Sequence, residues 1–287
     1  MANFTTTTSA VFIPEVWSVE TLREAEKALV MAPLVKRYDS LVKQRGDTIH
    51  IPHVSNLSAN DKTQDSEVTL QTVTETETSI SVDQWKEVSF EIEDIVKVQS
   101  QYDLRSEYTS KAGYAIAQAV DSDLLALYSS LTSTDVGTYG TDITDATIVA
   151  ALQALDEVDA PLEDRFFVIA PSQKAAIMKL DKFVKADYLG QYDMPTPVKT
   201  GPNNRYLWGD IYGVPTYYTN QIVTNTVPDP DETSNIMFHR EAFALAMQLS
   251  PRTQASYWQK DLAWLVTTDT IFGVSVLRDT FGVEVRS

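Results

Sequence analysis

The chain has 287 residues, of which 23 are Lys or Arg and 40 are Asp or Glu, so its formal net charge is −17. This acidic excess argues against general nucleic-acid binding, which normally uses a basic surface. There is no cysteine, which excludes disulfides, thiolate metal sites and cysteine nucleophiles. No apolar run approaches the roughly 20 residues that a membrane helix needs, and the threonine-rich start has no signal-peptide pattern.

The N-terminal part of the chain is predicted to contain a loose segment and one short helix. Residues 1–14 are rich in threonine and bury little apolar area, so we expect a flexible lead-in. Ser18 has the chemistry of a helix N-cap, with acidic residues in the first turns. Pro33 is expected to end that helix, because proline interrupts the helical hydrogen-bond pattern.

An extended arm follows. Residues 48–54 alternate as a strand does, and residues 68–82 form a second extended stretch after a polar tip at 55–67. An isolated two-stranded ribbon is marginally stable in water. We therefore expect this arm to lie against something else, and a neighbouring subunit is a good candidate.

The next elements are predicted to be a half-buried strand and a long helix. In residues 85–98, apolar side chains alternate with acidic ones, which indicates one buried and one solvated face. From Asp103 to Leu131, apolar and small residues recur close to the helical period. A helix of that length would extend about 42 Å.

The remaining sequence predicts a mixed α+β chain with two layers of organisation. Residues 133–144 form a loop that marks a domain boundary. The expected elements after it are a helix at 145–158, a strand at 165–169, a helix from Pro171, a loop at 190–208, a strand at 209–219 with Gly213 and Pro215 at a turn or bulge, a loop at 227–231, and mostly strands over 236–285, the strongest at 264–266 and 274–277.

Charge is unevenly distributed along the sequence. Residues 23–45 carry six basic and three acidic side chains, whereas residues 61–97 carry ten acidic and three basic ones. One interpretation is a pair of solvated faces. The other is that the basic segment contacts the acidic segment of another copy of the chain.

The residue patterns for catalysis or metal binding are weak. His50 and His53 are three apart on a strand and therefore point to opposite faces. Glu91, Glu93 and Asp94 form a carboxylate group that suits acid–base chemistry or a cation, but a solvated strand face is favoured. Other candidates have a structural explanation that we prefer: a turn at 229–232, different helix faces for Asp121 and Asp123, and buried aromatic packing for Trp208, Tyr217 and Tyr218. We assign no catalytic, cofactor-binding or metal-binding residue.

Several segments together resemble the major capsid protein of tailed bacteriophages, over nearly the whole chain. Their order and spacing carry the resemblance more than any one of them does. The segments are residues 12–18 (FIPEVWS) before a short helix, 46–52 (GDTIHIP) before a Thr/Glu-rich return strand, the helix at 103–131, 165–172 (RFFVIAPS), 209–217 (GDIYGVPTY), and the ending from 239–244 (HREAFA) through 280–283 (TFGV).

The resemblance implies an α+β phage major-capsid fold. Its expected parts are an N-terminal arm at 1–45, an extended loop at 46–82, a peripheral domain with a long spine helix at 83–135 and 236–287, and an axial domain at 136–235. It implies pentamers and hexamers of this chain in an icosahedral head that encloses phage double-stranded DNA. It also implies no enzymatic activity, no cofactor and no membrane.

Further expectations concern partners and location. The resemblance implies a virion component assembled in the host cytoplasm, with a portal and decoration proteins. Some relatives begin with a long scaffolding segment, whereas here the family-like motif starts near Pro14. A separate scaffolding protein is therefore implied, or an already processed chain, and Met1 favours the first. Some relatives also join a loop lysine to a neighbour's asparagine. Lys62 is a possible donor, but the predicted peripheral segments 80–131 and 236–287 contain no asparagine.

Two other functions compete with this one. An encapsulin-like nanocompartment shell would share the fold but enclose protein cargo instead of DNA. A hydrolase that uses Glu91, Glu93 or Asp94 would belong to another class, and it explains neither the arm nor the loose N-terminal segment. Particle size separates an enzyme from a shell, and the enclosed cargo separates the two shells.

Overall fold

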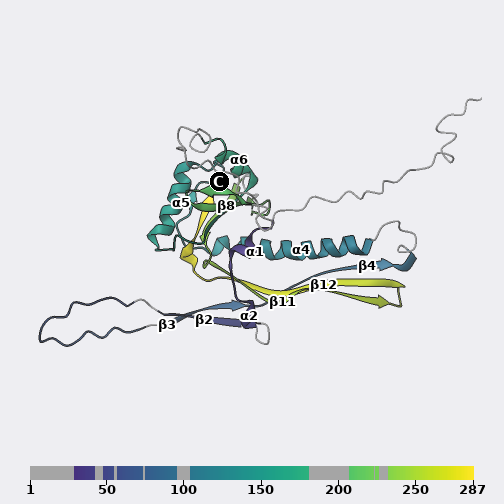
Figure 1. Cartoon of the computed structure of the whole chain (residues 1–287), viewed down its shortest axis with the longest axis horizontal. Helices are drawn as coiled ribbons and strands as arrows, with labels where there is room; N and C mark the ends of the chain where they lie inside the picture. The colour runs from purple at the N-terminus through teal and green to yellow at the C-terminus, as the bar shows by residue number, and fades with distance from the viewer. Residues whose placement is uncertain are drawn as a thin grey trace, which may run out of the picture.

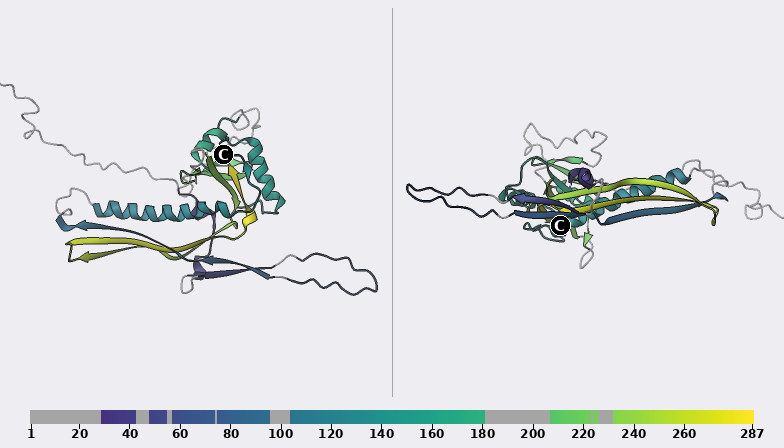
Figure 2. Two further views of the ribbon diagram at one scale, coloured as in Figure 1. Left: turned by 180° about the vertical axis from the view of Figure 1, so that it is seen from behind. Right: turned by 90° about the horizontal axis from the view of Figure 1, so that it is seen from below.

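The computed structural model describes residues 29–42, 48–54, 57–73, 75–95, 104–180, 207–222, 224–225 and 232–287. Three parts are visible in Figure 1: a long flat half, a compact body that contains the C-terminus, and a ribbon that projects away from both. The views from behind and from below, in Figure 2, show the same three parts.

The long half is a sheet with one helix lying along it. The sheet order is β1 (Lys36–Arg37), β11 (Phe243–Trp258), β12 (Ala263–Val276) and β4 (Gln84–Glu93). Helix α4 (Leu104–Ala126) runs along one face and continues as a 3-10 turn, η2 (Leu127–Ser130). In β4 every second side chain is half-buried and the others are exposed, and the Phe90 ring lies 5.7 Å from the Tyr108 ring of α4. The predicted long helix is confirmed, and the predicted strand is confirmed as far as Glu93; Asp94 and Ile95, which were expected to continue it, are helical.

The C-terminal strands are longer than the sequence predicts. The two strongest predicted strands, 264–266 and 274–277, both belong to β12, except that Leu277 follows its end. β11 and β12 pair antiparallel over most of their length, with irregular register between Met247 and Arg252. Polar residues in the middle of β12 hide this continuity from the sequence pattern. The strand nevertheless continues through them, because β11 and β4 pair with its backbone on both sides, whatever the side chains are.

The compact body is built on a seven-stranded sheet. Its order is β5 (Val136–Gly137), β13 (Gly282–Arg286), β10 (Glu232–His239), β6 (Arg165–Ile169), β8 (Val214–Tyr218) and β7 (Leu207–Ile211), with β9 (Thr224–Asn225) paired to β10. Helix α5 (Asp145–Glu157) packs on β10 and β13, and helix α6 (Pro171–Ile177) follows β6. Large buried side chains such as Phe167, Phe238 and Leu155 form the core. The predicted helix–strand–helix order is confirmed.

A tight hairpin replaces the single strand predicted at 209–219. Tyr212 and Gly213 have φ values of 51° and 80°, which are the two left-handed positions of a hairpin turn between β7 and β8. Gly213 therefore lies at a turn, as one of the two predicted alternatives has it. Pro215 lies within β8, opposite Asp210.

The ribbon consists of β2 (Thr48–Val54) and β3 (Glu75–Ser81), paired antiparallel. The predicted first strand is confirmed. The second strand is shorter than the predicted 68–82, because residues 57–73 have no strand partner among the described residues and form a long loop instead. The predicted tip at 55–67 is therefore only part of the loop.

The N-terminal prediction is corrected in its described part. Helix α1 (Met31–Leu34) contains Pro33, the residue that was expected to end a helix. Proline is tolerated in the first turn of a helix, where its missing N–H has no intrahelical partner. A second short helix, α2 (Asp39–Val42), was not predicted. The helix predicted from Ser18, the flexible lead-in and the loops at 190–206 and 227–231 lie outside the described residues.

Sheet membership does not follow the predicted domain boundary at residue 236. β10 and β13 lie in the seven-stranded sheet with β6, whereas β11 and β12 lie in the four-stranded sheet. The segment 236–287 is therefore divided between both halves, and the chain passes between them twice within it. Sequence periodicity finds strands but not the sheet that each one joins, because pairing is a long-range contact.

Candidate inter-subunit surfaces

The projecting arm, defined as β2, β3 and the loop 57–73, exposes apolar side chains that nothing in the described part of the chain covers. Leu70 is 90% exposed. The other exposed apolar side chains of the arm are Val54, Leu57, Val68 and Val73. Single exposed apolar residues are ordinary, but five on one thin arm, four of them in its loop and Val54 at the end of β2, form a surface that favours a partner.

The base of the arm is anchored firmly on its own subunit. Ile49 of β2 and Ile80 of β3 face each other and are both buried, together with Val82, Ala244 and Ala246. β3 also crosses closely over β12, since a Cβ on Gly273 would lie 2.1 Å from the Ser81 carbonyl oxygen. The arm therefore leaves the subunit in a fixed direction.

The two arm histidines lie on opposite faces of the ribbon, as predicted. His50 is exposed, and its Nδ1 lies 3.3 Å from Glu77 Oε1. The His53 Nε2 lies 2.9 Å from the Thr78 hydroxyl. They cannot converge on one ion. In the part of the chain that the structure describes, no group of three or more His, Asp or Glu residues is placed to hold a metal.

The carboxylates considered for acid–base chemistry lie along the outer side of the long half. Glu91 and Glu93 are exposed on β4. Asp94 accepts a hydrogen bond of 2.8 Å from the Tyr257 hydroxyl. The first two form the solvated strand face that the sequence favours, and the third is engaged in tying the end of β4 to β11.

The described basic residues of segment 23–45 already have partners in their own chain. Lys36 Nζ lies 2.5 Å from Glu241, and Arg37 lies 2.7 Å from Asp39. The bond from Lys36 holds the pKa of Glu241 below its ordinary value, and the same bond raises the pKa of Lys36. Neither side chain requires a neighbouring subunit to balance its charge.

Asp121 has a structural role that sequence reasoning missed. It is 1% exposed, and its carboxylate accepts N–H bonds from Val30, Met31 and Ala32 at 3.2, 2.7 and 3.3 Å. Burial raises the pKa of Asp121 although these three donors lower it. Asp123, on another face of α4, pairs with Lys86 at 3.2 Å. The different faces are confirmed, and the N-terminal segment is anchored on α4.

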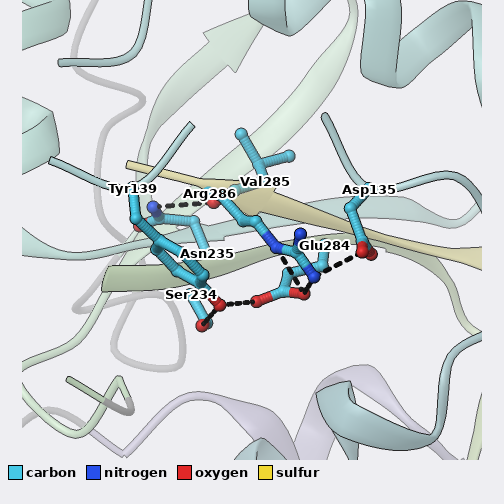
Figure 3. A network of polar contacts seen from close by, with 7 residues as sticks. All are labelled: Asp135, Tyr139, Ser234, Asn235, Glu284, Val285 and Arg286. Carbon is cyan, nitrogen blue, oxygen red and sulfur yellow. Dashed lines mark hydrogen bonds and ion pairs between the residues drawn. The ribbon is translucent and has the colours of Figure 1, made fainter. Parts of the chain in front are cut away.

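A polar network closes one edge of the compact body (Figure 3). Arg286 lies between Asp135 and Glu284, 3.1 Å from the latter, and stacks 5.1 Å from the centre of the Tyr139 ring. The Tyr139 hydroxyl donates to Glu284 at 2.7 Å. Burial raises the pKa of Tyr139 and of Asp135. The network joins the loop before α5 to the last strand of the chain.

The aromatic residues considered for ligand stacking pack within the protein. Lys174 Nζ lies 3.9 Å from the centre of the Tyr218 ring and 5.7 Å from that of Trp208. The Tyr217 ring meets Phe166 edge-on at 6.2 Å. All three aromatic residues pack against the core, as predicted, but they are partly buried rather than buried.

The fold is that of phage capsid shells. A solved structure from Mycobacterium phage Che8 superposes with a TM-score of 0.79 at 24% identity, and the match covers 96% of this chain and 97% of that one. The capsid structure of cyanophage P-SCSP1u gives 0.74 at 16% identity, with 97% and 93% covered. The mature capsid of bacteriophage PhiM1 gives 0.72 at 14% identity, with 96% and 91% covered.

The sequence itself identifies the family. A family model described as phage capsid protein matches residues 75–284, which is more than half of the chain. The chain therefore belongs to the phage capsid protein family and is a major capsid shell protein, a structural component of the virion. A sequence search of curated proteins returns no significant match.

Proposed function

We propose that copies of this chain assemble into pentamers and hexamers that form an icosahedral head around double-stranded DNA. The arm of each subunit lies on a neighbouring subunit. The observation that carries this proposal is the arm itself: its base is fixed by buried Ile49 and Ile80, while Leu70 and its apolar neighbours are exposed. In a shell a neighbour buries these side chains and so contributes to the free energy of assembly.

The charge of the chain suits an enclosing wall. With a net charge of −17, the subunits carry the same sign of charge as DNA and do not attract it strongly, and strong attraction would hinder both packaging and release. The proposal includes no sequence-specific contact with the DNA. It also includes a separate scaffolding protein, a portal and decoration proteins as partners, and assembly in the host cytoplasm.

The parts of the subunit have corresponding roles in this proposal. The long half with α4 is the peripheral domain, and the compact body with α5 and α6 is the axial domain, with β10 and β13 added to it by sheet membership. Residues 46–82 form the extended loop and residues 1–45 the N-terminal arm. The elements with few internal contacts adapt to the different environments of pentamers and hexamers.

A shortened arm tests the proposal. Val54 and Glu75 lie directly opposite each other in the ribbon, so residues 55–74 can be replaced by Asn-Gly, the two-residue turn that joins paired strands. We expect a soluble, folded subunit that forms no normal shells in electron microscopy. Normal shells from this variant would refute the arm contact.

Point substitutions separate apolar burial from loop length. Leu57, Val68 and Leu70 changed together to Ser should reduce shell yield strongly, because they remove exposed apolar surface and leave the subunit core intact. The matched control changes Thr69 and Thr72, two exposed residues of the same loop, to Ser and should assemble normally. Equal yields from the two variants would assign the contact to the backbone rather than to these side chains.

A further inference from the structure

The two halves of the subunit are joined where two passages of the chain lie side by side. Residues 240–242 lead from β10 to β11, and residues 277–281 lead from β12 through the 3-10 turn η4 (Asp279–Phe281) to β13. The N–H groups of Leu277 and Arg278 both donate to the Ala242 carbonyl, at 2.8 and 3.3 Å. A movement of the backbone in either passage therefore disturbs the hydrogen bonds of the other.

His239 is the side chain that ties these passages together. It is 6% exposed, and its ring meets the Phe281 ring edge-on at 5.7 Å and 88°. Its Nδ1 lies 3.2 Å from the Glu241 N–H, which donates to it, and its carbonyl accepts from Ala242 N–H at 2.8 Å. An imidazole nitrogen accepts a hydrogen bond only while it carries no proton. The turn as it stands therefore requires a neutral ring whose proton is on Nε2.

Charged groups of both signs face this ring. They are Glu241 on the same turn, Asp164 and Arg165 at the start of β6, and Arg278 on the second passage. Burial lowers the pKa of His239 below its ordinary value; Arg165 and Arg278 lower it as well, whereas Glu241 and Asp164 oppose the change.

A cleft beside the ring gives water and protons access to the junction. It has a volume of about 540 Å³. Its lining combines β1, the turn before β6 and the turn after β10, and it includes Lys36, Asp164, His239, Arg240 and Glu241. Two contacts join residues of this lining: the Lys36–Glu241 ion pair, and the bond of 3.0 Å from Arg240 N–H to the Asp164 carbonyl.

We propose that His239 is a proton switch that holds the junction between the two sheets at neutral pH and loosens it on acidification. A proton taken from solvent binds Nδ1, whose new N–H then points at the backbone N–H of Glu241. Two donors face each other, and no acceptor is left between them. The hydrogen bond is lost, a charge is left in a poorly solvated position, and the passage 240–242 separates from 277–281.

The direction of the pH effect on stability follows from the lowered pKa of His239. The contribution of neutral His239 is fully present above the ordinary imidazole pKa of about 6.5. It is lost as the pH falls through that value toward the lower pKa of the folded protein. At low pH the two halves of the subunit become free to change their relative orientation. Any effect of this change on a shell rests on the assembly proposed above.

Hydrogen exchange of the full chain, followed by mass spectrometry and corrected for intrinsic rates, tests this inference. Between about pH 7.5 and about pH 5, wild-type peptides covering 236–246 and 274–283 should exchange about fivefold faster, the change expected when an opening equilibrium loses one ordinary hydrogen bond. His239→Asn places an amide oxygen near the position of Nδ1 and does not titrate, so it should not show this acceleration. The matched control is His50→Asn, on the exposed ribbon, which should behave as the wild type.

Two results would overturn the switch: wild-type exchange at the junction that does not depend on pH, or the same acceleration in His239→Asn. A second variant covers the case in which His239→Asn does not fold. Arg278→Gln removes an exposed cation that lowers the pKa of His239, so the midpoint of the wild-type transition should move to higher pH. An unchanged midpoint would also overturn the proposal.

Discussion

Met31 donates its backbone N–H to Asp121 Oδ1 over 2.7 Å, which joins the first described helix to the middle of the long helix across 90 residues of sequence. Val30 donates to the other carboxylate oxygen at 3.2 Å. One buried side chain thus satisfies the free N–H groups at the start of α1 and holds α1 against α4.

Asp121→Asn tests this anchor. The amide has one acceptor oxygen, so its NH₂ group must face one of the backbone donors, and we expect a loss of about 1–3 kcal/mol in the free energy of unfolding. Because the folded pKa of Asp121 is raised, its ionisation destabilises the wild type as the pH rises from 3.8 through the folded value. Urea unfolding should therefore show a smaller deficit at neutral pH than at low pH. A deficit that grows with pH would contradict the raised pKa.

Any side chain at Gly273 should destabilise the protein where the arm crosses the long sheet. A Cβ at this position would meet the Ser81 carbonyl oxygen at 2.1 Å and the Val82 Cα at 2.9 Å. Both are backbone atoms, so the base of the arm must move, and Gly273→Ala should cost about 1–3 kcal/mol in thermal unfolding. Gly113→Ala, in α4, is the matched control. Nothing lies within 4 Å of its added methyl, so stability should rise by about 1 kcal/mol.

A charge swap distinguishes the two interpretations of the basic N-terminal segment. If Lys36 acts through Glu241 of the same chain, Lys36→Glu should weaken assembly or stability, and Lys36→Glu combined with Glu241→Lys should restore it. If Lys36 instead contacts an acidic segment of another subunit, the double variant should stay defective. In both cases the defect should shrink as salt screens the exposed charges. A defect that does not depend on salt concentration would indicate damaged packing.

Arg286 should matter more for stability than a surface arginine does. Its removal in Arg286→Met leaves the 4% exposed Glu284 without its cation, and the free energy of unfolding should fall by about 1–3 kcal/mol. Tyr139→Phe removes only one hydroxyl from the same network and should cost about 1 kcal/mol. Chemical denaturation at neutral pH measures both. Equal, negligible effects would show that the network contributes no net stability.

We expect mature shells without covalent links between subunits. Lys62 is exposed in the arm loop and bonds locally, to the Thr63 carbonyl and the Ser66 hydroxyl. Neither 80–131 nor 236–287 contains an asparagine to accept it. Asn235, directly before the second segment, is buried, and its amide NH₂ donates to the Val285 carbonyl and the Ser287 hydroxyl. Particles boiled in detergent should release one band near 32 kDa. A ladder of larger bands would refute this and make Lys62 the first residue to mutate.

The sequence by itself determined the elements with strong local periodicity and the family. The alternation in β4, the helical spacing of α4 and the Pro171 start of α6 are written in neighbouring residues, so they were predictable. The ordered motifs along the chain were enough to indicate a capsid shell protein, as the family match over 75–284 confirms. The exposed polar loop between two strands likewise indicated a projecting arm.

Only the tertiary structure decided which strands share a sheet and which polar residues act at a distance. β10 and β11 are separated by a three-residue turn yet lie in different sheets. Asp121 and His239 have no sequence pattern that sets them apart, because their partners lie on other elements or depend on the path of the backbone. Such contacts form when the chain folds back on itself, and local propensity carries no information about them.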